Sequence, residues 1–483
     1  MNVMLNPRRM LIGGELVESQ SGEWLESVNP ANEELIGKVP LGAAADVHRA
    51  VAAAESAAPA WDAAGVKERA RHLRNLGQAL TARAKEILAV EVADTGNTIT
   101  KLSGDVAAAV EALEHFAGLG LEIKGETIPA SPQNLHLTIR QPYGVVGRIA
   151  PFNHPIMFAA GGLAAPLMAG NTVVVKPPEQ SPLSATILSE LCAEVFPQGV
   201  VNIVTGYGAD AGDALVRHPS VKRIAFIGSV PTGRAIQRAA AETGVKHVSL
   251  ELGGKNPMII FPDVDLDEAV NAAIGGMNFA WQGQSCGSTS RLLLHESLYE
   301  KFLDKLVARI AGLRIGDPAS PASQMGPVNS KAHYERVLHY IEAGKADGAK
   351  LATGGKRPPG ADFTRGYWIE PTVFANVTAD MRIAREEIFG PVLSVLRWSS
   401  FDEAIAIANG TEYGLTASIW TRDIKQALRA AKAVNSGYIW INGFSAHYRG
   451  TPFGGLKNSG IGREEGLDDL LSYTETKAIH IML

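Results

Sequence analysis

The stretch VVGRIAPFNHPIMFAAGGLAAPLMAGNTVVVKPPEQ, residues 145–180, decides the fold. Two short runs rich in β-branched residues, Val145–Ala150 and Thr172–Lys176, flank an apolar middle part that carries no charge. That part is long enough to raise the question of a membrane span, but glycines and a proline interrupt it. We therefore expect a soluble protein with a buried helix over about Ile156–Met168, ending before Gly170, between two buried strands.

The same alternation continues along the chain as far as Gly254. Apolar runs of strand length recur between segments with helical spacing, and such β-α-β alternation is typical of a parallel, doubly wound sheet with helices on both faces. The further strands expected are Val201–Val204, Arg223–Ile227 and Val248–Leu252, and the helices between them are Pro182–Phe196, Ala209–Val216 and Thr232–Gly244.

A second series of the same kind follows, so the chain is predicted to hold two α/β domains. Its expected strands are Pro257–Phe261, Arg291–His295, Val392–Arg397 and Tyr438–Asn442, and its expected helices are Glu300–Leu313, Ser330–Ala346, Phe401–Asn409 and Ile424–Asn435.

Two further predicted features precede these series in the chain. Ala43–Ala58 and Val66–Asp94 have apolar residues at helical spacing and predict amphipathic helices, the first ended by Pro59. Residues 121–142 are polar with β-branched alternation and predict a hairpin arm. A two-stranded arm is marginally stable alone, so we expect it to pack on something else.

Composition narrows the class of protein. With 483 residues the chain has room for two or three domains, and 46% hydrophobic with 20% charged residues is ordinary globular composition. A net charge of -5 gives no reason to expect nucleic acid or an anionic membrane as partner. The amino-terminal segment has no apolar core typical of a signal peptide. Two cysteines without clustered Cys/His spacing predict neither a disulfide framework nor a metal site, and they fit the cytoplasm.

The two cysteines differ in their surroundings. Cys192 lies in an apolar stripe at helical spacing and is predicted to be core filler. Cys286 follows Trp281-Gln282-Gly283-Gln284-Ser285 and precedes a glycine, so small neighbours leave its sulfur open to approach. By itself this pattern fits a nucleophile and a buried loop cysteine equally well.

Two segments could hold a dinucleotide. Gly228 and Gly233 lie where a strand turns into a helix, which would let a phosphate approach backbone N–H groups, although such turns are more often only tight turns. Lys176 and Glu179 end a buried strand, where a carboxylate could accept both ribose hydroxyls; a solvated loop pair is the alternative. A carboxylate there repels a 2'-phosphate and favours NAD over NADP.

Two polar side chains are candidates for acid–base and oxyanion chemistry. Glu251 lies within an apolar strand just before paired glycines, where burial would raise its pKa toward that of a general base; a buried salt bridge to Lys255 is the alternative. Asn153 lies in a turn between two prolines and could donate to an oxyanion, or simply bond its own backbone.

These motifs occur in one order and together resemble the aldehyde dehydrogenase superfamily, essentially from end to end. The matching segments are Asn153, Lys176, Glu179, Gly228 to Gly233, Glu251-Leu252-Gly253-Gly254-Lys255, Gly283-Gln284-Ser285-Cys286, Glu386-Glu387-Ile388-Phe389-Gly390-Pro391 and Pro452-Phe453-Gly454-Gly455.

The resemblance implies a role for each matching residue. Cys286 would be the nucleophile that attacks an aldehyde, Asn153 and the backbone N–H of Cys286 would hold the oxyanion, and Glu251 would activate the water that releases the acid. Glu464 would be a second carboxylate near the water path. Relatives that transfer the acyl group to coenzyme A commonly lack the glutamate at position 251, so its presence favours hydrolysis.

The resemblance also implies the cofactor contacts. Lys176 and Glu179 would bind the adenosine ribose and Ser229 the pyrophosphate. Glu387 and Phe389 would hold the nicotinamide ribose and ring. The cofactor implied is NAD, with NADP disfavoured.

The expected substrate tunnel departs from the family pattern at several positions. Phe152 stands where tryptophan is usual, His154 where an aromatic residue is usual, and Gly161 where a bulky residue often lies. Aromatic side chains favour a bulky hydrophobic or aryl aldehyde, whereas His447 and Arg449 could instead receive an anion. The expected tunnel residues are Phe152, His154, Phe158, Gly161, Trp281, Phe444, His447 and Arg449.

The implied architecture is a Rossmann-like cofactor domain (1–123 and 143–253), a catalytic α/β domain (254–458) and a small β oligomerisation arm (124–142 and 470–483). Family arms extend a partner's sheet, which implies a homotetramer built as a dimer of dimers, or a homodimer. The competing hypotheses are a CoA-acylating semialdehyde dehydrogenase and a non-catalytic binding protein with the same fold.

Overall fold

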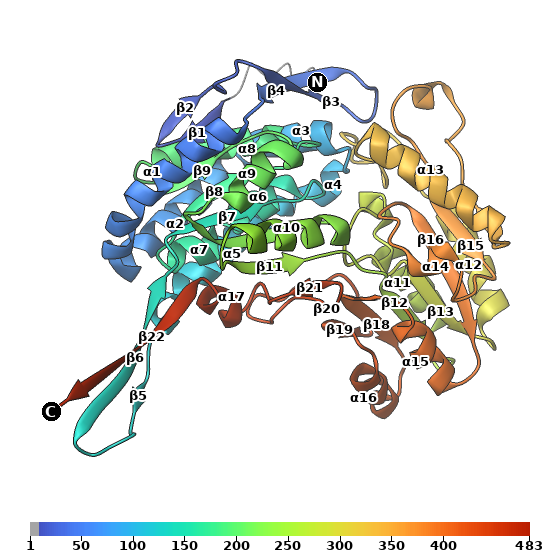
Figure 1. Ribbon diagram of the computed structural model, residues 1–483. Coiled ribbons are helices and arrows are strands. Elements are labelled where there is room, and N and C mark those ends of the chain that lie inside the picture. Colours follow the sequence, from blue (N-terminus) through green and yellow to red (C-terminus); the bar gives the residue numbers. More distant parts are fainter. Residues whose placement is uncertain (1–8) are drawn as a thin grey trace.

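The computed structural model describes residues 9–483. Residues 1–8, which begin the expected cofactor domain and the amino-terminal segment interpreted above, lie outside the described residues. Figure 1 shows two lobes, each built around a twisted sheet, and an arm that projects from the first lobe.

The first sheet has eight strands in the order β2-β1-β9-β8-β7-β10-β11-β21. Its five central strands are parallel, as the alternation in the sequence predicts, and the strands at both edges are antiparallel to their neighbours. The central strands are β9 (Val201–Ile203), β8 (Thr172–Lys176), β7 (Val145–Ile149), β10 (Val221–Ile227) and β11 (His247–Glu251), and the edge strands are β2 (Glu15–Val17), β1 (Met10–Ile12) and β21 (Gly460–Ile461).

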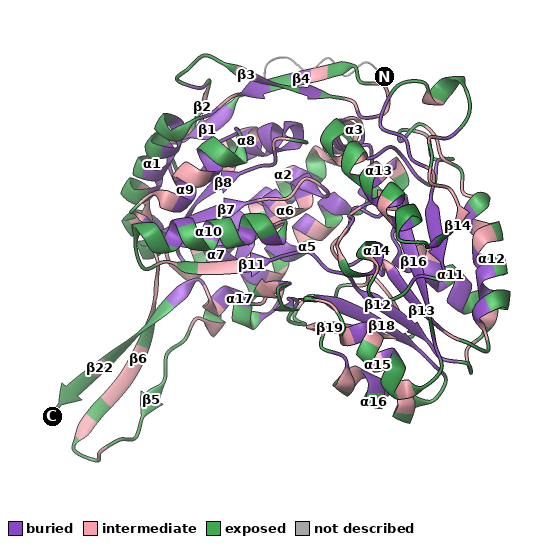
Figure 2. Ribbon diagram, turned by 45° about the vertical axis from the view of Figure 1, so that its right-hand side comes forward, coloured by how far each residue is buried: buried purple, intermediate pink, exposed green. Residues whose placement is uncertain are grey.

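Helices cover both faces of this sheet because successive strand residues point to opposite sides. In β8, Val173 and Val175 contribute to one core and Val174 to the other. Figure 2 shows the buried strands between helices whose outer sides are exposed. The first core includes α2 (Gly65–Ala82), α5 (Asp105–Gly118), α6 (Pro155–Gly161), α7 (Ala164–Met168) and α8 (Leu183–Val195), and the second includes α1 (Ala44–Ala63), α9 (Asp213–Arg217) and α10 (Val230–Thr243).

The second sheet has seven strands in the order β14-β15-β16-β13-β12-β18-β19, all parallel except β14. The strands are β14 (Lys350–Thr353), β15 (Thr372–Ala375), β16 (Val392–Trp398), β13 (Arg291–His295), β12 (Pro257–Ile260), β18 (Thr416–Trp420) and β19 (Tyr438–Ile441). One face packs on α11 (Leu266–Gly276) and α12 (Tyr299–Ala311), and the other on α13 (Lys331–Ala346), α14 (Arg382–Arg385), α15 (Phe401–Asn409) and α16 (Ile424–Ala433).

The arm is a three-stranded antiparallel sheet rather than an isolated hairpin. Its strands are β5 (Thr127–Ile128), β6 (Asn134–Pro142) and the carboxyl-terminal β22 (Thr474–Met482). β22 pairs with β6 along its whole length, so the two expected oligomerisation segments form one sheet, with the carboxyl terminus near its tip (Figure 1). The expected hairpin is therefore present, and its packing partner is the end of the same chain.

Pro59 does not end the first helix, which is a correction to the prediction above. α1 continues through Pro59 to Ala63. Trp61, in its last turn, is buried, and its ring N–H donates to the Leu167 carbonyl oxygen at 3.1 Å. This tertiary contact keeps the helix going although proline removes one hydrogen bond.

Two other expected helices are divided. Val66–Asp94 forms α2 and α3 (Ala84–Thr95), broken at Arg83, whose side chain pairs with Glu86 and Glu190. The buried helix before Gly170 is split into α6 and α7 at paired glycines.

Several short elements had no clear signal in the sequence. These elements are β3 (Trp24–Val28), β4 (Leu35–Pro40), β17 (Tyr413–Gly414), β20 (Leu456–Lys457), α4 (Ile99–Leu102), α17 (Leu467–Leu471) and the single turns Gly120–Glu122, Phe279–Trp281 and Ala361–Phe363. The helical segment Gly208–Gly212 and α9 together occupy the expected helix Ala209–Val216.

Candidate active site

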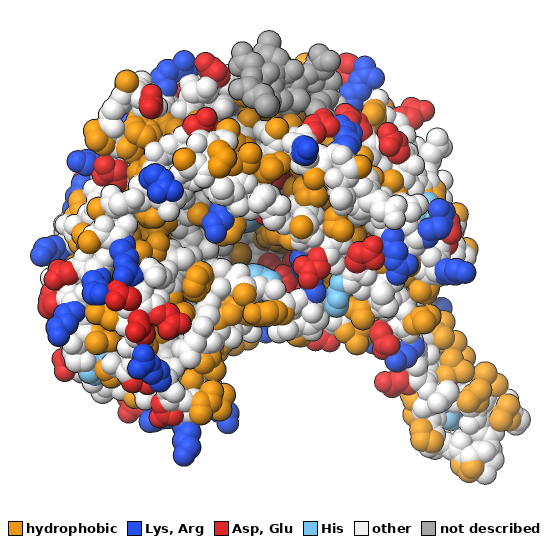
Figure 3. Space-filling view, turned by 180° about the vertical axis from the view of Figure 1, so that it is seen from behind, with side chains coloured by type: hydrophobic (Ala, Val, Ile, Leu, Met, Phe, Trp, Pro, Cys, Tyr) orange, Lys and Arg blue, Asp and Glu red, His pale blue; other side chains and the backbone are white. Residues whose placement is uncertain are grey.

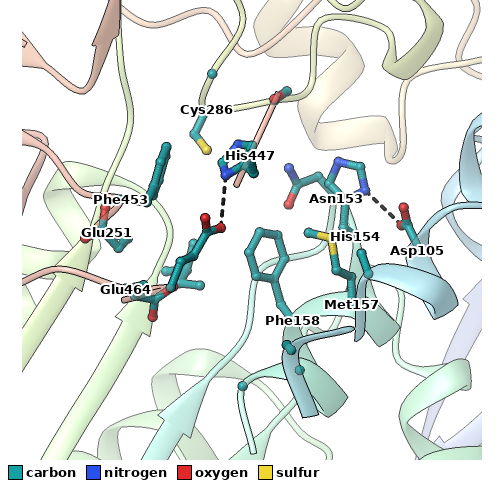
Figure 4. Close-up of a pocket in the computed structure, with 18 of the residues that line it drawn as sticks. Asp105, Asn153, His154, Met157, Phe158, Glu251, Cys286, His447, Phe453 and Glu464 are labelled. Atoms are coloured by element: carbon teal, nitrogen blue, oxygen red, sulfur yellow. Dashed lines mark hydrogen bonds and ion pairs between the residues drawn. The ribbon is translucent and has the colours of Figure 1, made fainter. Parts of the chain in front are cut away.

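A cavity of about 400 Å³ lies where the two lobes meet, and Cys286, Asn153 and Glu251 all line it. Figure 3 shows this face of the molecule hollowed, with acidic and histidine side chains gathered at the hollow. Figure 4 shows the sulfur of Cys286, the amide of Asn153 and the side chain of Glu251 around one space. The structure therefore brings together the three residues on which the sequence-based mechanism depends.

Cys286 is held by a tightly folded loop after α11. Gly283 has a φ of +67°, and a Cβ there would collide with the carbonyl oxygen of Gly390. The side-chain amide of Asn256 donates to the carbonyl oxygens of Cys286 (2.7 Å) and Ser288 (2.9 Å). These two hydrogen bonds hold the Cys286 loop in place. Asn256 was not singled out in the sequence, although it is a polar residue two positions after the paired glycines.

The thiol is protonated in this arrangement. Burial raises the pKa of Cys286 to about 12, and the carboxylates of Glu387 and Glu251 act in the same direction. The backbone N–H groups of Gly287 and Cys286 lower it. A base must therefore take the proton before the sulfur can attack, because the thiolate is the nucleophile.

Asn153 lies in the turn before α6 and does not bond its own backbone. Its amide donates to the Gln284 carbonyl oxygen at 3.0 Å, which leaves the second N–H for another acceptor. The turn itself is fixed from α3 and the loop after it: Asn97 donates to the Asn153 carbonyl oxygen at 2.9 Å, and Glu91 accepts from the backbone N–H of Ile156 at 2.7 Å. Asn97 and Glu91 were not predicted.

Glu251 ends β11 with an unpaired carboxyl group. Among the described residues neither of its carboxyl oxygens has a hydrogen-bond partner, and Lys255 Nζ has none either. The expected alternative, a salt bridge between the two, is therefore absent from the described part of the chain. Burial, reinforced by the charge of Glu464, raises the pKa of Glu251 well above its usual value. Gly454 makes room for the carboxyl group, because a Cβ there would approach it to 2.7 Å.

Glu464 also lines the cavity and pairs with Arg148 at 3.3 Å. Arg148 further donates to the hydroxyl of Tyr473 at 2.7 Å. The Arg148 guanidinium occupies the space that a side chain on Gly162 would need. Glycine at position 162 therefore makes room for the pair of Arg148 with Glu464 at the cavity wall.

Six of the eight expected tunnel residues line the cavity: His154, Phe158, Gly161, Trp281, His447 and Arg449. Phe152 and Phe444 are not among the lining residues, and both predictions are corrected. Phe152 packs edge to face on Phe389 (5.6 Å between ring centroids), and Phe444 packs against Gly275 in the core beneath the loop.

The polar tunnel residues are paired with carboxylates. His154 bonds to Asp105 at 2.8 Å, and Glu465 binds both His447 (2.9 Å) and Arg449 (3.3 Å). Asp105 and Glu465 were missed because each meets its partner only in the folded chain.

None of the expected dinucleotide residues lines the second opening, which is in the first lobe, but Ser229 and Gly233 flank its lining residues Pro231 and Thr232 in the chain. Lys176 is buried and pairs with Glu179, so the two are not a freely solvated loop pair. Ser229 caps the amino terminus of α10 by accepting from the Thr232 N–H. A groove of about 530 Å³ runs between α9 and α10, from Gly208 to Ala239. Gly228 and Gly233 have no room for a side chain, the first because of Phe226 and the second because of Leu252.

This arrangement fits a dinucleotide. The groove offers an apolar slot for a flat base, Glu179 lies next to its rim at Gly208, and the positive end of the α10 dipole suits a pyrophosphate.

Glu387 and Phe389 lie nearer to Cys286. Glu387 accepts from the Gly254 N–H at 3.0 Å, and its carboxyl group fills the space above Gly253, where a Cβ would collide with it. Burial raises the pKa of Glu387 to about 7. Phe389 has a φ of +61°, which is rare for a bulky residue and fixes its ring against Phe152.

Residues 9–483 contain no group of three or more His, Cys, Asp or Glu side chains placed to hold a metal ion. In the same residues no helix is both long and apolar enough to cross a membrane.

Comparison with known proteins gives consistent results. Residues 16–479 match the model of the aldehyde dehydrogenase family. The chain is 45% identical to the aldehyde dehydrogenase tropH of Talaromyces stipitatus over 95% of this chain and 90% of that one. It is 43% identical to a hydroxyisobutyraldehyde dehydrogenase of Mycolicibacterium austroafricanum, over 99% and 94%. An aldehyde dehydrogenase of Bacillus cereus, solved as its NAD+ complex, superposes with a TM-score of 0.96 at 40% identity, covering 100% of this chain and 98% of the other.

Proposed function

Because this chain belongs to the aldehyde dehydrogenase family, we propose that it oxidises its substrate through a covalent adduct on Cys286 and releases the product by hydrolysis. The chain is an NAD-dependent aldehyde dehydrogenase that converts an aldehyde to the corresponding acid. The observation that carries the covalent mechanism is the shared cavity of Cys286, Asn153 and Glu251.

The first step is attack of the Cys286 sulfur on the carbonyl carbon. The thiol proton passes to Glu251, because burial raises the pKa of this carboxyl group and makes it a stronger base than an exposed glutamate. The second N–H of the Asn153 amide and the backbone N–H of Cys286 donate to the oxyanion that forms.

The chemistry supplied by NAD, when bound, is acceptance of the hydride whose loss turns the adduct on Cys286 into a thioester. Glu179, Lys176 and Ser229 would hold its adenosine and pyrophosphate, and Glu387 would hold the nicotinamide ribose. Glu251 first releases the thiol proton to solvent; its carboxylate then takes a proton from water, the hydroxide adds to the thioester carbonyl, and the thiolate of Cys286 leaves with release of the acid.

The test follows NADH absorbance and product for wild type, Cys286→Ala and Glu251→Gln, with NAD and NADP and an aldehyde panel. Cys286→Ala should lose activity by more than about a thousandfold. Glu251→Gln should slow turnover by roughly 10²–10⁴-fold, and an acylated Cys286 should become visible by mass spectrometry if its adduct still forms.

Coenzyme A separates the hydrolytic from the acyl-transferring hypothesis. Acyl-CoA as the main product in its presence would overturn the proposed hydrolysis. An activity that survives in Cys286→Ala would overturn the covalent mechanism, and a chain that oxidises no aldehyde would favour the binding-protein hypothesis.

We propose a bulky, mainly hydrophobic or aryl aldehyde as substrate, since Phe158, Trp281 and Phe453 line the cavity. Pairing of His447 and Arg449 with Glu465 argues against an anion at these residues. One relative is named for hydroxyisobutyraldehyde, which is small and hydroxylated. Short aliphatic aldehydes with higher kcat/KM than aryl aldehydes would contradict the proposal.

We also propose how the chains assemble, where the enzyme is located and where the domains begin and end. We propose a homodimer or a dimer of dimers joined through the arm, and a cytoplasmic enzyme. The proposed cofactor domain is 1–123 with 143–253, and the proposed catalytic domain is 254–458.

A further inference from the structure

Two imidazoles in the active-site cavity are fixed in the same way. His154, before α6, and His447, in the loop after β19, each bond through Nδ1 to a carboxylate, Asp105 and Glu465 respectively. An ionised carboxylate can only accept, so Nδ1 is the donor in both contacts. Figure 4 shows both contacts as dashed lines on different walls of the site.

This pairing leaves Nε2 of each ring facing away from its carboxylate. In the described residues neither Nε2 has a hydrogen-bond partner, and neither is a fully buried atom; His154 as a whole is 9% exposed, and the His447 side chain, at the cavity's outer wall, is 39% exposed. Both residues line the cavity. In a neutral imidazole with the proton on Nδ1, Nε2 is an acceptor, so the cavity presents two acceptors that the protein itself does not satisfy.

Aromatic neighbours hold both rings in place. His154 packs edge to face on Trp281 (5.3 Å) and Phe158 (6.1 Å). His447 lies between Phe453 (4.7 Å) and Tyr438 (5.9 Å). A bound molecule would therefore meet apolar surface interrupted at two fixed acceptors, which suits an apolar skeleton with hydroxyl groups.

We propose that Nε2 of His154 and of His447 accept hydrogen bonds from hydroxyl groups of the substrate, so that the enzyme selects hydroxylated aldehydes over aldehydes with the same skeleton and no hydroxyl. This inference rests on the proposed function and narrows its substrate class. Carboxylate groups are disfavoured, because they cannot donate to an acceptor and because Asp105, Glu111 and Glu465 lie in the same cavity.

The test compares matched pairs: para-hydroxybenzaldehyde with benzaldehyde, and hydroxypivaldehyde with pivaldehyde. The readout is the ratio of kcat/KM within a pair, which a general loss of stability or of chemistry does not move. In the wild-type enzyme the hydroxylated member of at least one pair should be favoured by about tenfold or more, because a site built for a hydroxyl discriminates against analogues without it.

Substitutions of each histidine show which of the two is responsible for the preference for a hydroxylated aldehyde. His154→Phe and His447→Phe keep ring shape and remove the acceptor; at least one should reduce the ratio fivefold or more, mainly through the KM of the hydroxylated member. His154→Asn, whose amide oxygen can accept, should recover part of the ratio if His154 is responsible. His339→Phe, at an exposed position of α13, is the matched control and should keep the wild-type ratio.

A wild-type ratio near one in both pairs, or a ratio unchanged in both phenylalanine variants, would overturn this inference while leaving the proposed function standing. If neither member of either pair reduces NAD and the wider panel also fails, the proposed function itself is wrong.

Discussion

At the scale of single residues, the proposed general base is one of the buried groups that lack a hydrogen-bond partner within the part of the chain that the structure describes. Buried polar groups are usually hydrogen-bonded, yet the Glu251 carboxyl group and Lys255 Nζ have no partner within residues 9–483. Burial lowers the pKa of Lys255 to about 7 and raises that of Glu251. Burial thus favours the uncharged form of both groups, and an uncharged form that is close in free energy to the charged one is useful where protons must be moved.

Glu91 gives a residue-level prediction of stability. It is buried, accepts from Ile156 N–H and Ser184 Oγ, and burial raises its pKa to about 8 from an ordinary value near 4.5. The folded state thus holds a proton that the unfolded chain releases, so this group destabilises the fold progressively as pH rises from about 4.5 to 8.

In Glu91→Gln the acceptor remains and the titration is lost. Its free energy of unfolding relative to wild type should increase by about 4 kcal/mol between pH 5 and 8.5, measured by urea denaturation. Asp469, which is also buried and titrates in the same sense, is present in both proteins and cancels in the comparison. A difference that stays constant with pH would show that Glu91 is ionised in the fold.

The sequence identified residues with chemistry of their own and missed those that act through a partner. Cys286, Glu251 and Asn153 were found because a thiol, a strand carboxylate and a turn amide each stand out in their local context. Asp105 and Asn256 were missed because their partners, His154 and the Cys286 carbonyl, are distant in the chain. Phe444 was misplaced because a loop aromatic gives no sign of whether it turns into the core or the cavity.

Among the elements, hydrophobic periodicity located all five central strands of the first sheet but only four of the seven strands of the second, without β14, β15 and β18. β8 and α15 match their predicted limits, because both are bounded by sharp local signals. β18 was missed, since a five-residue strand containing Thr and Ser carries little periodicity, yet it lies between β12 and β19. The break at Arg83 depends on an ion pair with Glu190 of another helix, which no local pattern encodes.

Pro59 gives a prediction at the scale of one helix. It lies inside α1 at an exposed position, where its ring removes one intrahelical hydrogen bond. Pro59→Ala restores the donor, and the gain is partly offset because alanine makes the unfolded chain more flexible. We expect a net stabilisation of about 1–2 kcal/mol in urea denaturation. A loss of stability instead would mean that the ring itself packs favourably.

The whole molecule exposes an arm that a single chain does not cover. Ile128, Leu135, Ile139 and Ile481 are each about 40% exposed on its strands. Protruding strands with apolar side chains readily associate, which fits assembly through this element.

Ending the chain after Tyr473 tests this role, because it removes β22 and leaves β6 without its main partner. We expect a smaller assembly by light scattering coupled to size-exclusion chromatography. Removing only Met482 and Leu483, which are 77% and 87% exposed, is the control and should keep the full mass. An unchanged mass in the longer truncation would exclude the arm as the joining element.

The distribution of the two thiols has a consequence for survival under oxidative stress. Cys192 lies on the buried face of α8, and burial raises the pKa of its thiol, so an oxidant that enters the cavity meets Cys286 alone. A sulfenic acid formed there would find no resolving cysteine in its own chain, since the only other thiol is sealed in the core. Reduction of the oxidised Cys286 must then come from a diffusible thiol that fits through the substrate entrance. The shape of that entrance therefore sets the rate at which an oxidised enzyme regains activity.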